Sequence, residues 1–382
     1  QDLQYVYYLL SLIDELPQDK SILIYLLLKK WNEQKDISLE EKDYELSIHF
    51  LKTYTNNRVE DQLFQMLYIL SIDQIVDDKI SLYKLINKNG IEANFTNYGA
   101  TILSLLIPTK NGKIDVVLGF DSVAEYIKAY EIGASPYFNS IVGRFAGRIK
   151  NAQFELNGKT IQLDQNHGKH HLHGGKHQLS NVAWNFENYN EETNTLSFSY
   201  LSKANEFYPG DVTIEVDYTL TDNNQLNIKY KATTTEDTLL NLTNHAYFNL
   251  DGISGNTLDQ KLQINAEKFL ELDSENIPTG KFIPMENHAF DFRNPKNVVA
   301  GIDHCFVLKN HTAPAAILES VKNDLIMKVY TDQPAVQIYV GGKTSNELLN
   351  KDSVEFHTES GICFETQVFP DAPNHADFPN AI

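Results

Sequence analysis

The distribution of glycine constrains this chain more than any other feature of its sequence. All 19 glycines of the 382 residues lie at or after Gly90, and Pro17 is the only proline before Pro108. Glycine and proline supply the backbone conformations that tight turns need. A segment without them favours helix over turn-rich β structure. We therefore divide the chain into residues 1–80 and residues 81–382.

Residues 1–80 are predicted to form a small all-α helical module. Apolar side chains recur there at a spacing of three to four residues, as in amphipathic helices. A third helix is expected to open at Ser38, because Glu41 three residues later completes a capping-box pattern. This part carries no cluster of metal-ligating residues, glycine-rich loop or nucleophile motif. The simpler interpretation is a packing or adaptor bundle, and the alternative is a module that binds a protein partner.

Residues 81–382 follow a β pattern. Short runs that alternate apolar and polar residues are separated by the turn dipeptides Asn89-Gly90, Asn111-Gly112 and Asn157-Gly158. The last of these lies inside "AQFELNGKTIQL", which predicts a hairpin. We expect no helix of ordinary length to interrupt the strands. This periodicity predicts a mainly β fold, a large antiparallel β-sandwich.

Charge and cysteine content restrict the environment and the partners. The chain has 32 Lys and Arg residues against 51 Asp and Glu residues, a formal charge of −19, which argues against nucleic acid or an anionic membrane as a partner. Cys305 and Cys363 are too few for a disulfide scaffold, so a reducing, cytoplasmic location is expected. No apolar run approaches the ~20 residues of a membrane-spanning helix.

Histidines are the first candidates for chemistry near neutral pH. In "LHGG", His173 precedes two glycines, and His171 would share its face if both lay on one strand. The flexible glycines would leave room for a ligand, although a plain glycine turn explains the fragment equally well. In "LTNHAYFNL", His245 stands among Asn244, Tyr247 and Asn249. That segment fits either a hydrogen-bonded core histidine or a sugar site, since sugars offer hydroxyls and apolar faces.

Two further segments carry charge in apolar or glycine-rich surroundings. Glu365 lies in "CFETQVFPD", where a carboxylate within an apolar strand must be paired or functional. Gln367 is expected on the same face. In "GRFAGRI", Arg144 and Arg148 suit a bidentate clamp on oxygen atoms, and they suit salt bridges between strands equally well.

In their order along the chain these segments are more specific than any one of them. The series "NYGATI", "VVLGFD", "GRFAGRI", "LHGG", "LTNHAYFNL", "GIDHCF" and "ETQVFPDAPN" closely resembles the galactose mutarotase (aldose 1-epimerase) family. The resemblance covers about residues 81–379 and implies a supersandwich fold. It leaves residues 1–80 unaccounted for.

The resemblance implies an isomerase that interconverts the α and β anomers of free aldohexoses such as galactose and glucose, with no metal and no nucleotide cofactor. It implies that Glu365 is the base and His245 the acid. Residues implied to bind the sugar are Arg148, His173, Asp303 and Gln337, and the sugar-stacking interpretation adds Tyr247.

Two departures from the family pattern lead to expectations. Many relatives have Asn where this chain has Gly147, so one polar contact to the sugar is expected to be missing. Relatives usually continue past "FPNAI" into a last strand, whereas this chain stops at Ile382. Either an unpaired sheet edge is therefore expected, or the sequence is truncated and its last strand is missing.

Three alternative functions remain. A cupin-like metal enzyme could use His171, His173, His245 and Glu365 as ligands. A relative acting on hexose 6-phosphates would need additional Lys or Arg at the mouth of the pocket, and the acid excess does not favour it. A non-catalytic carbohydrate-binding module would be expected to have lost Glu365 or His245.

Overall fold

The structure is a computed structural model that describes residues 80–204 and 207–382. The predicted helical module, residues 1–80, lies outside the described residues except for Ile80. The described part is mainly β structure, which confirms the coarser prediction from periodicity.

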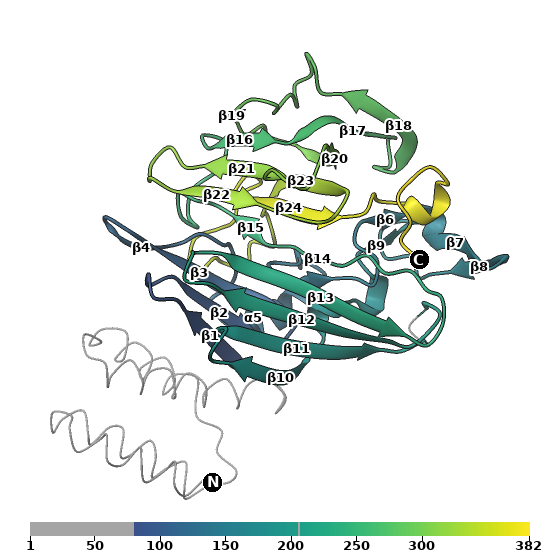
Figure 1. Ribbon diagram of the computed structural model, residues 1–382, viewed down its shortest axis with the longest axis horizontal. Helices are drawn as coiled ribbons and strands as arrows, with labels where there is room; N and C mark the ends of the chain where they lie inside the picture. Colours follow the sequence, from purple (N-terminus) through teal and green to yellow (C-terminus); the bar gives the residue numbers. More distant parts are fainter. Residues whose placement is uncertain (1–79, 205–206) are drawn as a thin grey trace, which may run out of the picture. The chain divides into compact units, whose positions relative to one another are not determined.

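One group of strands consists of two four-stranded antiparallel sheets that follow the chain order (Figure 1). The first contains β1 (Leu82–Ile86), β2 (Glu92–Thr96), β3 (Thr101–Thr109) and β4 (Gly112–Asp115). The second contains β10 (Asn185–Asn190), β11 (Thr195–Ser202), β12 (Val212–Leu220) and β13 (Leu226–Thr234). The Asn89-Gly90 and Asn111-Gly112 dipeptides lie at the β1–β2 and β3–β4 turns, as predicted.

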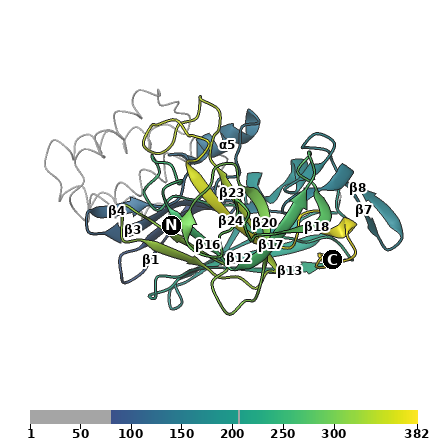
Figure 2. The same cartoon turned by 90° about the horizontal axis from the view of Figure 1, so that it is seen from above.

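A second group of strands carries the functional side chains. Its six-stranded sheet has the order β15-β24-β23-β20-β17-β18, and a four-stranded sheet has the order β19-β16-β21-β22. Figure 2 labels all strands of the six-stranded sheet except β15. The members of the first are β15 (Tyr247–Phe248), β24 (Gly361–Gln367), β23 (Ala335–Gly341), β20 (Asp303–Leu308), β17 (Ala266–Leu272) and β18 (Pro278–Pro284). The members of the second are β19 (Lys296–Asn297), β16 (Lys261–Ile264), β21 (Ala316–Glu319) and β22 (Ile326–Val329).

Both groups of strands bury side chains in one common hydrophobic core. Phe95 and Phe198 enter it from the first group, and Phe306 and Ile338 enter it from the six-stranded sheet. Successive side chains of a strand point to opposite faces. The face of β23 and β24 opposite this core is therefore available for a site.

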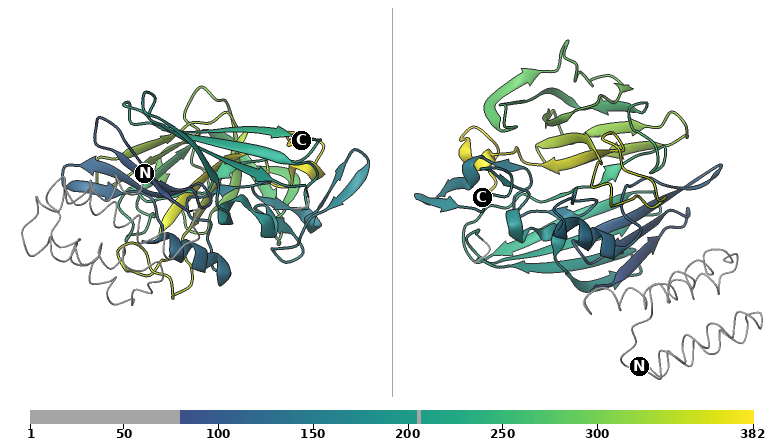
Figure 3. Two further views of the ribbon diagram at one scale, coloured as in Figure 1. Left: turned by 90° about the horizontal axis from the view of Figure 1, so that it is seen from below. Right: turned by 180° about the vertical axis from the view of Figure 1, so that it is seen from behind.

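Short strands connect the two groups and form one end of the described part. β5 (Ile141–Val142) pairs with β14 (Thr243–Asn244), and β6 (Arg148–Ile149) pairs with β9 (His171–Leu172). The hairpin of β7 (Gln153–Leu156) and β8 (Lys159–Gln162) projects at this end (Figure 3). Its turn is at Asn157-Gly158, and both residues have positive φ, as the dipeptide predicted.

The expectation that no ordinary helix interrupts the strands was wrong. Helix α5 (Val123–Glu131) follows Ser122, whose side chain accepts the N–H of Glu125 while the Glu125 carboxylate accepts the N–H of Ser122. Ser122 and Glu125 form a capping box, a helix signal that the sequence carries between two β patterns. No helix of the described residues is long and apolar enough to cross a membrane.

The alternation of β23 side chains between the core face and the cavity face leads to a prediction about stability. Ile338 is fully buried on the core face, so Ile338→Ala is expected to lower the free energy of unfolding by about 2–5 kcal/mol. Ile326 on β22 is 60% exposed, and Ile326→Ala should change it by no more than about 0.5 kcal/mol. Urea unfolding of both variants measures the difference. Equal losses would contradict the assignment of the two faces.

Candidate active site

The strand register brings His245 and Glu365 together. In the antiparallel pair of β15 and β24, Tyr247 lies opposite Cys363. Two residues further along, the same register puts His245 opposite Glu365, although the two strands are no longer hydrogen-bonded there. The His245 Nε2 atom lies 3.6 Å from the Glu365 Oε1 atom, and both side chains are buried. An imidazole and a carboxyl group therefore face each other across a strand pair.

The neighbouring strands β23 and β20 add polar side chains on the same face. Gln337 lies opposite Glu365 in the register of β23 and β24, and its Nε2 donates a hydrogen bond of 2.5 Å to Asp303 Oδ1. Asp303 begins β20, and Arg148 on β6 approaches its carboxylate at 3.8 Å. Three sheet strands and one short connecting strand thus converge on one place.

His173 enters the site through an unusual backbone conformation. It follows β9 with a φ of 53°, in the left-handed region, and Gly174 continues with a φ of 91°. A Cβ atom at Gly174 would lie 1.8 Å from the Gly143 carbonyl oxygen, so only glycine fits. The predicted shared face of His171 and His173 was wrong, because the left-handed residue turns the chain out of the strand.

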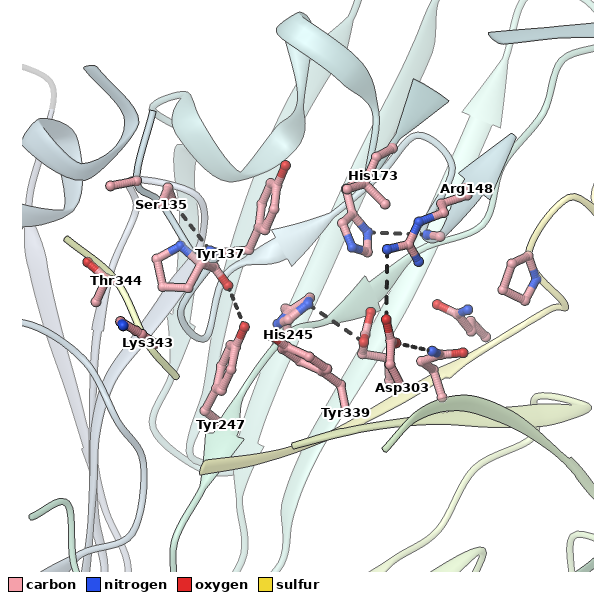
Figure 4. A pocket seen from close by; sticks show the side chains of 18 of the residues that line it. Ser135, Tyr137, Arg148, His173, His245, Tyr247, Asp303, Tyr339, Lys343 and Thr344 are labelled. Atoms are coloured by element: carbon pink, nitrogen blue, oxygen red, sulfur yellow. Dashed lines mark hydrogen bonds and ion pairs between the residues drawn. The ribbon is translucent and has the colours of Figure 1, made fainter. Parts of the chain in front are cut away.

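These side chains line one cavity of about 440 Å³ (Figure 4), which is within the range of small-molecule sites. All seven site residues predicted from the sequence line it, namely Arg148, His173, His245, Tyr247, Asp303, Gln337 and Glu365. The Tyr247 hydroxyl donates to the Pro136 carbonyl, so its ring, and not a free hydroxyl, borders the cavity.

Burial shifts the proton affinities of the facing pair in opposite directions. Burial first, and then the charge of Asp303, raise the pKa of Glu365 to about 8, although Arg148 opposes the shift. Burial lowers the pKa of His245 to about 4. Between these values the pair holds one proton, because the first proton is bound near pH 8 and the second only near pH 4.

The two histidines differ in the partners of their ring nitrogens. His245 Nδ1 lies 3.7 Å from the buried thiol sulfur of Cys363, which leaves Nε2 facing Glu365. His173 Nδ1 accepts the backbone N–H of Gly147 at 3.2 Å, so its Nε2 carries the proton when the ring is neutral. Burial first, and then the neighbouring His245 and Arg148, lower the pKa of His173 well below its ordinary value.

Several buried polar atoms of the cavity have no hydrogen-bond partner among the described residues. They are Arg148 Nε, Gln337 Oε1, Thr344 Oγ1, Glu365 Oε2 and both amide atoms of Gln367. Unsatisfied buried polar atoms are costly, and a ligand that both donates and accepts would satisfy them. Hydroxyl groups do both, so the lining suits a polyhydroxylated molecule.

Three side chains of the cavity could also hold a metal ion. One ligand atom each from His173, His245 and Glu365 lies within 4.8 Å of the others. The structure does not bring the fourth predicted ligand to them. His171 uses Nδ1 toward Asp164, at 2.9 Å from the backbone oxygen, and Nε2 toward the Tyr208 hydroxyl at 2.6 Å.

The two arginines of "GRFAGRI" have different surroundings. Arg144 is buried away from the cavity, and it donates through Nε to Ser202 Oγ and through its terminal nitrogens to the carbonyls of Ser202 and Pro209, at 2.8–3.0 Å. Arg148 lines the cavity. The two-arginine clamp was wrong, because only Arg148 lines the cavity. The alternative of a salt bridge between strands is confirmed for Arg148, whose terminal nitrogen lies 3.8 Å from the carboxylate of Asp303 on β20.

The cavity also contains residues that the sequence did not single out. Tyr339 lies two residues from Gln337 on β23, so strand alternation was a usable signal for it, as it was for Gln367, which was expected on the face of Glu365. Tyr137, Lys343 and Thr344 come from loops, where no motif marked them.

The fold and the site together define a mainly β enzyme with a buried carboxyl–imidazole pair beside sugar-compatible polar groups. Comparison with known proteins identifies its family. The family model described as aldose 1-epimerase matches residues 81–382. An aldose 1-epimerase of Haemophilus influenzae is 37% identical over 314 residues, which cover 78% of this chain and 89% of that protein. A galactose mutarotase of Sus scrofa is 36% identical over 302 residues, 76% of this chain and 86% of that protein.

Solved structures agree with the sequence matches. An aldose epimerase homologue from C. elegans superposes with a TM-score of 0.73 at 31% identity, covering 79% of this chain and 94% of that chain. A galactose 1-epimerase from Lactobacillus acidophilus has a TM-score of 0.69 at 28% identity, covering 78% and 90%. The chain belongs to the aldose 1-epimerase family and is an isomerase, as its motifs predicted.

The contrast between the two arginines is testable with one substitution type. Arg144→Lys is expected to lower the free energy of unfolding by roughly 2–4 kcal/mol, because lysine cannot reproduce its hydrogen bonds to three acceptors. Arg148→Lys should leave stability within about 1 kcal/mol and reduce kcat/KM for anomer exchange. Thermal unfolding and an anomer-exchange assay on both variants separate the two effects. The reverse pattern would contradict these assignments.

Proposed function

We propose that the chain interconverts the α and β anomers of a free aldohexose such as galactose or glucose, with Glu365 and His245 as the acid–base pair. The observation that carries the proposal is the 3.6 Å approach of His245 Nε2 to Glu365 Oε1 at the buried centre of the cavity. Opening a sugar ring requires one group that removes a proton and one that delivers a proton, on a single small substrate.

In the proposed complex the anomeric hydroxyl lies at Glu365 and the ring oxygen at His245. Asp303, held by Gln337 and Arg148, accepts hydrogen bonds from adjacent hydroxyls, and Arg148 donates to them. The protonated Nε2 of His173 donates near the ring oxygen, since its Nδ1 is already occupied by Gly147. The ring of Tyr247 packs against the apolar face of the sugar.

The ring-opening step moves one proton at each end of a breaking bond. Ionised Glu365 takes the proton of the anomeric hydroxyl, the C1–O5 bond breaks as the carbonyl forms, and protonated His245 delivers its proton to O5. The product is an open-chain aldehyde beside a protonated Glu365 and a neutral His245. Rotation about C1–C2 followed by the reverse transfers closes the ring on the other face of the carbonyl.

The pKa shifts support this proton inventory. The ionised pair and the neutral pair both contain one proton, so the catalyst never exchanges a proton with water during a turnover. Burial favours the neutral pair, the form that accompanies the open-chain aldehyde. The reactive ionised pair arises when the proton moves from Glu365 to His245 within the buried site.

We also propose a more detailed description of the fold and of its domains. We infer that the two groups of strands around the common core form the predicted β-sandwich, with residues 81–382 as its catalytic domain. A cytoplasmic location and a protein partner for the helical module at 1–80 remain proposals, and residues 1–80 are not needed for any step described above.

Two alternatives have distinct experimental outcomes. A metal enzyme using His173, His245 and Glu365 would contain stoichiometric Zn, Fe or Mn after purification. A carbohydrate-binding module would bind sugar without accelerating anomer exchange. Polarimetry on fresh α-D-glucose and α-D-galactose, together with metal analysis, distinguishes both from the proposed isomerase.

Removing either member of the pair should abolish most of the activity. Glu365→Gln and His245→Asn are each expected to reduce kcat by about 10²–10⁴-fold, the usual contribution of an acid–base group. The exposed residues Glu191 and His311 provide matched controls, and Glu191→Gln and His311→Asn should retain full activity. A Glu365→Gln variant as fast as the parent protein would refute the assignment of the base.

The pH dependence should follow the shared proton. Above pH about 8, Glu365 loses its proton and the pair has no acid to donate, so activity falls. Below pH about 4, His245 gains a second proton and the pair has no base, so activity falls again. We expect a bell-shaped profile of kcat/KM between these limits after subtraction of the spontaneous rate. A profile that is flat from pH 3 to pH 10 would exclude a titrating pair.

A further inference from the structure

The strand that carries Arg148 is too short to hold this side chain by itself. β6 contains only Arg148 and Ile149, which pair with Leu172 and His171 of β9. The guanidinium nevertheless reaches a defined place in the cavity, where one terminal nitrogen lies 3.8 Å from the Asp303 carboxylate (Figure 4). Strands of ordinary length fix their side chains through repeated pairing, and a two-residue strand has little of it. We therefore looked for a support of Arg148 outside the strand pair.

That support comes from Asp371, which follows β24, the strand that carries Glu365. The N–H of Asp371 donates to the carbonyl oxygen of Arg148 at 2.7 Å. Its carboxylate Oδ1 accepts the backbone N–H of Lys150 at 2.9 Å. One residue thus binds the backbone on both sides of Ile149. The two bonds fix the direction in which the Arg148 side chain leaves its strand.

Asp371 is itself tightly held. It is fully buried, and its φ of 57° lies in the left-handed region, where Asp and Asn are enriched among residues other than glycine. Asn374 Nδ2 donates to Asp371 Oδ1 at 2.7 Å, and His375 Nε2 lies 3.2 Å from Oδ2. A buried carboxyl group is costly without such partners. Burial and these contacts together leave the Asp371 side chain little freedom to move.

The same segment packs directly against the residue before Arg148. A Cβ atom at Gly147 would lie 3.2 Å from Pro370 Cβ, and Gly147 has a φ of 86°. Glycine allows both the close approach and the left-handed backbone conformation. The backbone around Arg148 and the segment after β24 are therefore in contact as well as hydrogen-bonded.

We propose that Asp371 is a positioning residue for the isomerase and that it acts through Arg148. The inference rests on the proposed function, in which Arg148 donates to sugar hydroxyls. Glu365 and Asp371 belong to one continuous segment, so the support holds the guanidinium at a fixed distance from the base. Within the described part of the chain, Pro370 lines the cavity and Asp371 does not. Asp371 thus has no contact of its own with the sugar in the proposed complex.

The test removes the carboxylate and keeps the backbone conformation. Glycine accepts a φ of 57° and retains the N–H that Arg148 needs, but it leaves the Lys150 N–H without its acceptor. Asp371→Gly is expected to lower kcat/KM for galactose anomer exchange about ten- to a hundredfold, the cost of a misplaced binding group. The loss should appear mainly as a higher KM, because Arg148 contacts hydroxyls that do not react. Asp371→Asn keeps an acceptor oxygen and should restore most of kcat/KM.

A double-mutant cycle tests whether the effect passes through Arg148. In an Arg148→Ala background, Asp371→Gly should cause little further loss of kcat/KM, because the group that it positions is already gone. Equal fold losses in the two backgrounds would overturn the proposal, since Asp371 would then act on the fold as a whole. A loss confined to kcat would also overturn it, because that result points to Glu365.

Asp222→Gly is the matched control. Asp222 lies in the turn between β12 and β13, and its carboxylate also accepts a backbone N–H, that of Lys88 at 3.1 Å, outside the cavity lining. Its loss should leave kcat and KM unchanged. If thermal unfolding shows that Asp371→Gly does not fold, Asp371→Ser provides the same comparison, because its hydroxyl is one bond too short to reach Lys150.

Failure of the proposed isomerase function has a different signature. If the parent protein does not accelerate anomer exchange, that function fails, and positioning is measured without a sugar. NMR relaxation of the Arg148 Nε–H signal reports the order of this side chain. Asp371→Gly should lower the order parameter, whereas Asp371→Asn and Asp222→Gly should not. An order parameter that is the same in Asp371→Gly and the parent protein would overturn the positioning role independently of catalysis.

Discussion

The site depends on one cross-strand pair, in which a buried carboxyl group at Glu365 faces a buried imidazole at His245. The six-stranded sheet tolerates this buried pair because its other face carries the apolar core. Ile362 and Phe364 point to that core face, and Glu365 points to the cavity, so the polar group displaces no core residue. Desolvation then acts on both groups in opposite directions and leaves one proton between them. A surface pair would hold its proton differently, since water would stabilise both charges.

The elements around this pair have separate functions. The long strands fix Asp303, Gln337 and Glu365 through hydrogen-bonded register, which allows little adjustment. Short strands and turns bring the remaining groups from a distance in sequence, and His173 reaches the cavity only because a left-handed residue precedes two glycines. A long strand thus holds Glu365, whereas His245 lies in the short connection between β14 and β15, and loops form part of the cavity wall.

Family membership and local chemistry give complementary information about this chain. The matched relatives account for the fold and for the reaction class of an aldose 1-epimerase. The local contacts add the proton that Glu365 and His245 share and the different surroundings of Arg144 and Arg148.

The sequence by itself determined the change from a glycine-free segment to β structure, the hairpin turns, and the strand alternation that puts Glu365 and Gln367 on one face. These are local properties, set by backbone preference and by the period of a strand. Its ordered motifs also indicated the family and the seven cavity residues.

Only the tertiary structure decided between residues that look alike in sequence. Arg144 and Arg148 share a motif, yet one is buried against carbonyls and the other lines the cavity. His171 and His173 point to different places because His173 has a left-handed backbone conformation. The alternation of side chains along β9 therefore does not extend to it. Lys343 had no motif at all. Such choices depend on contacts between segments far apart in the chain, and local sequence patterns contain no information about which distant segment a side chain will meet.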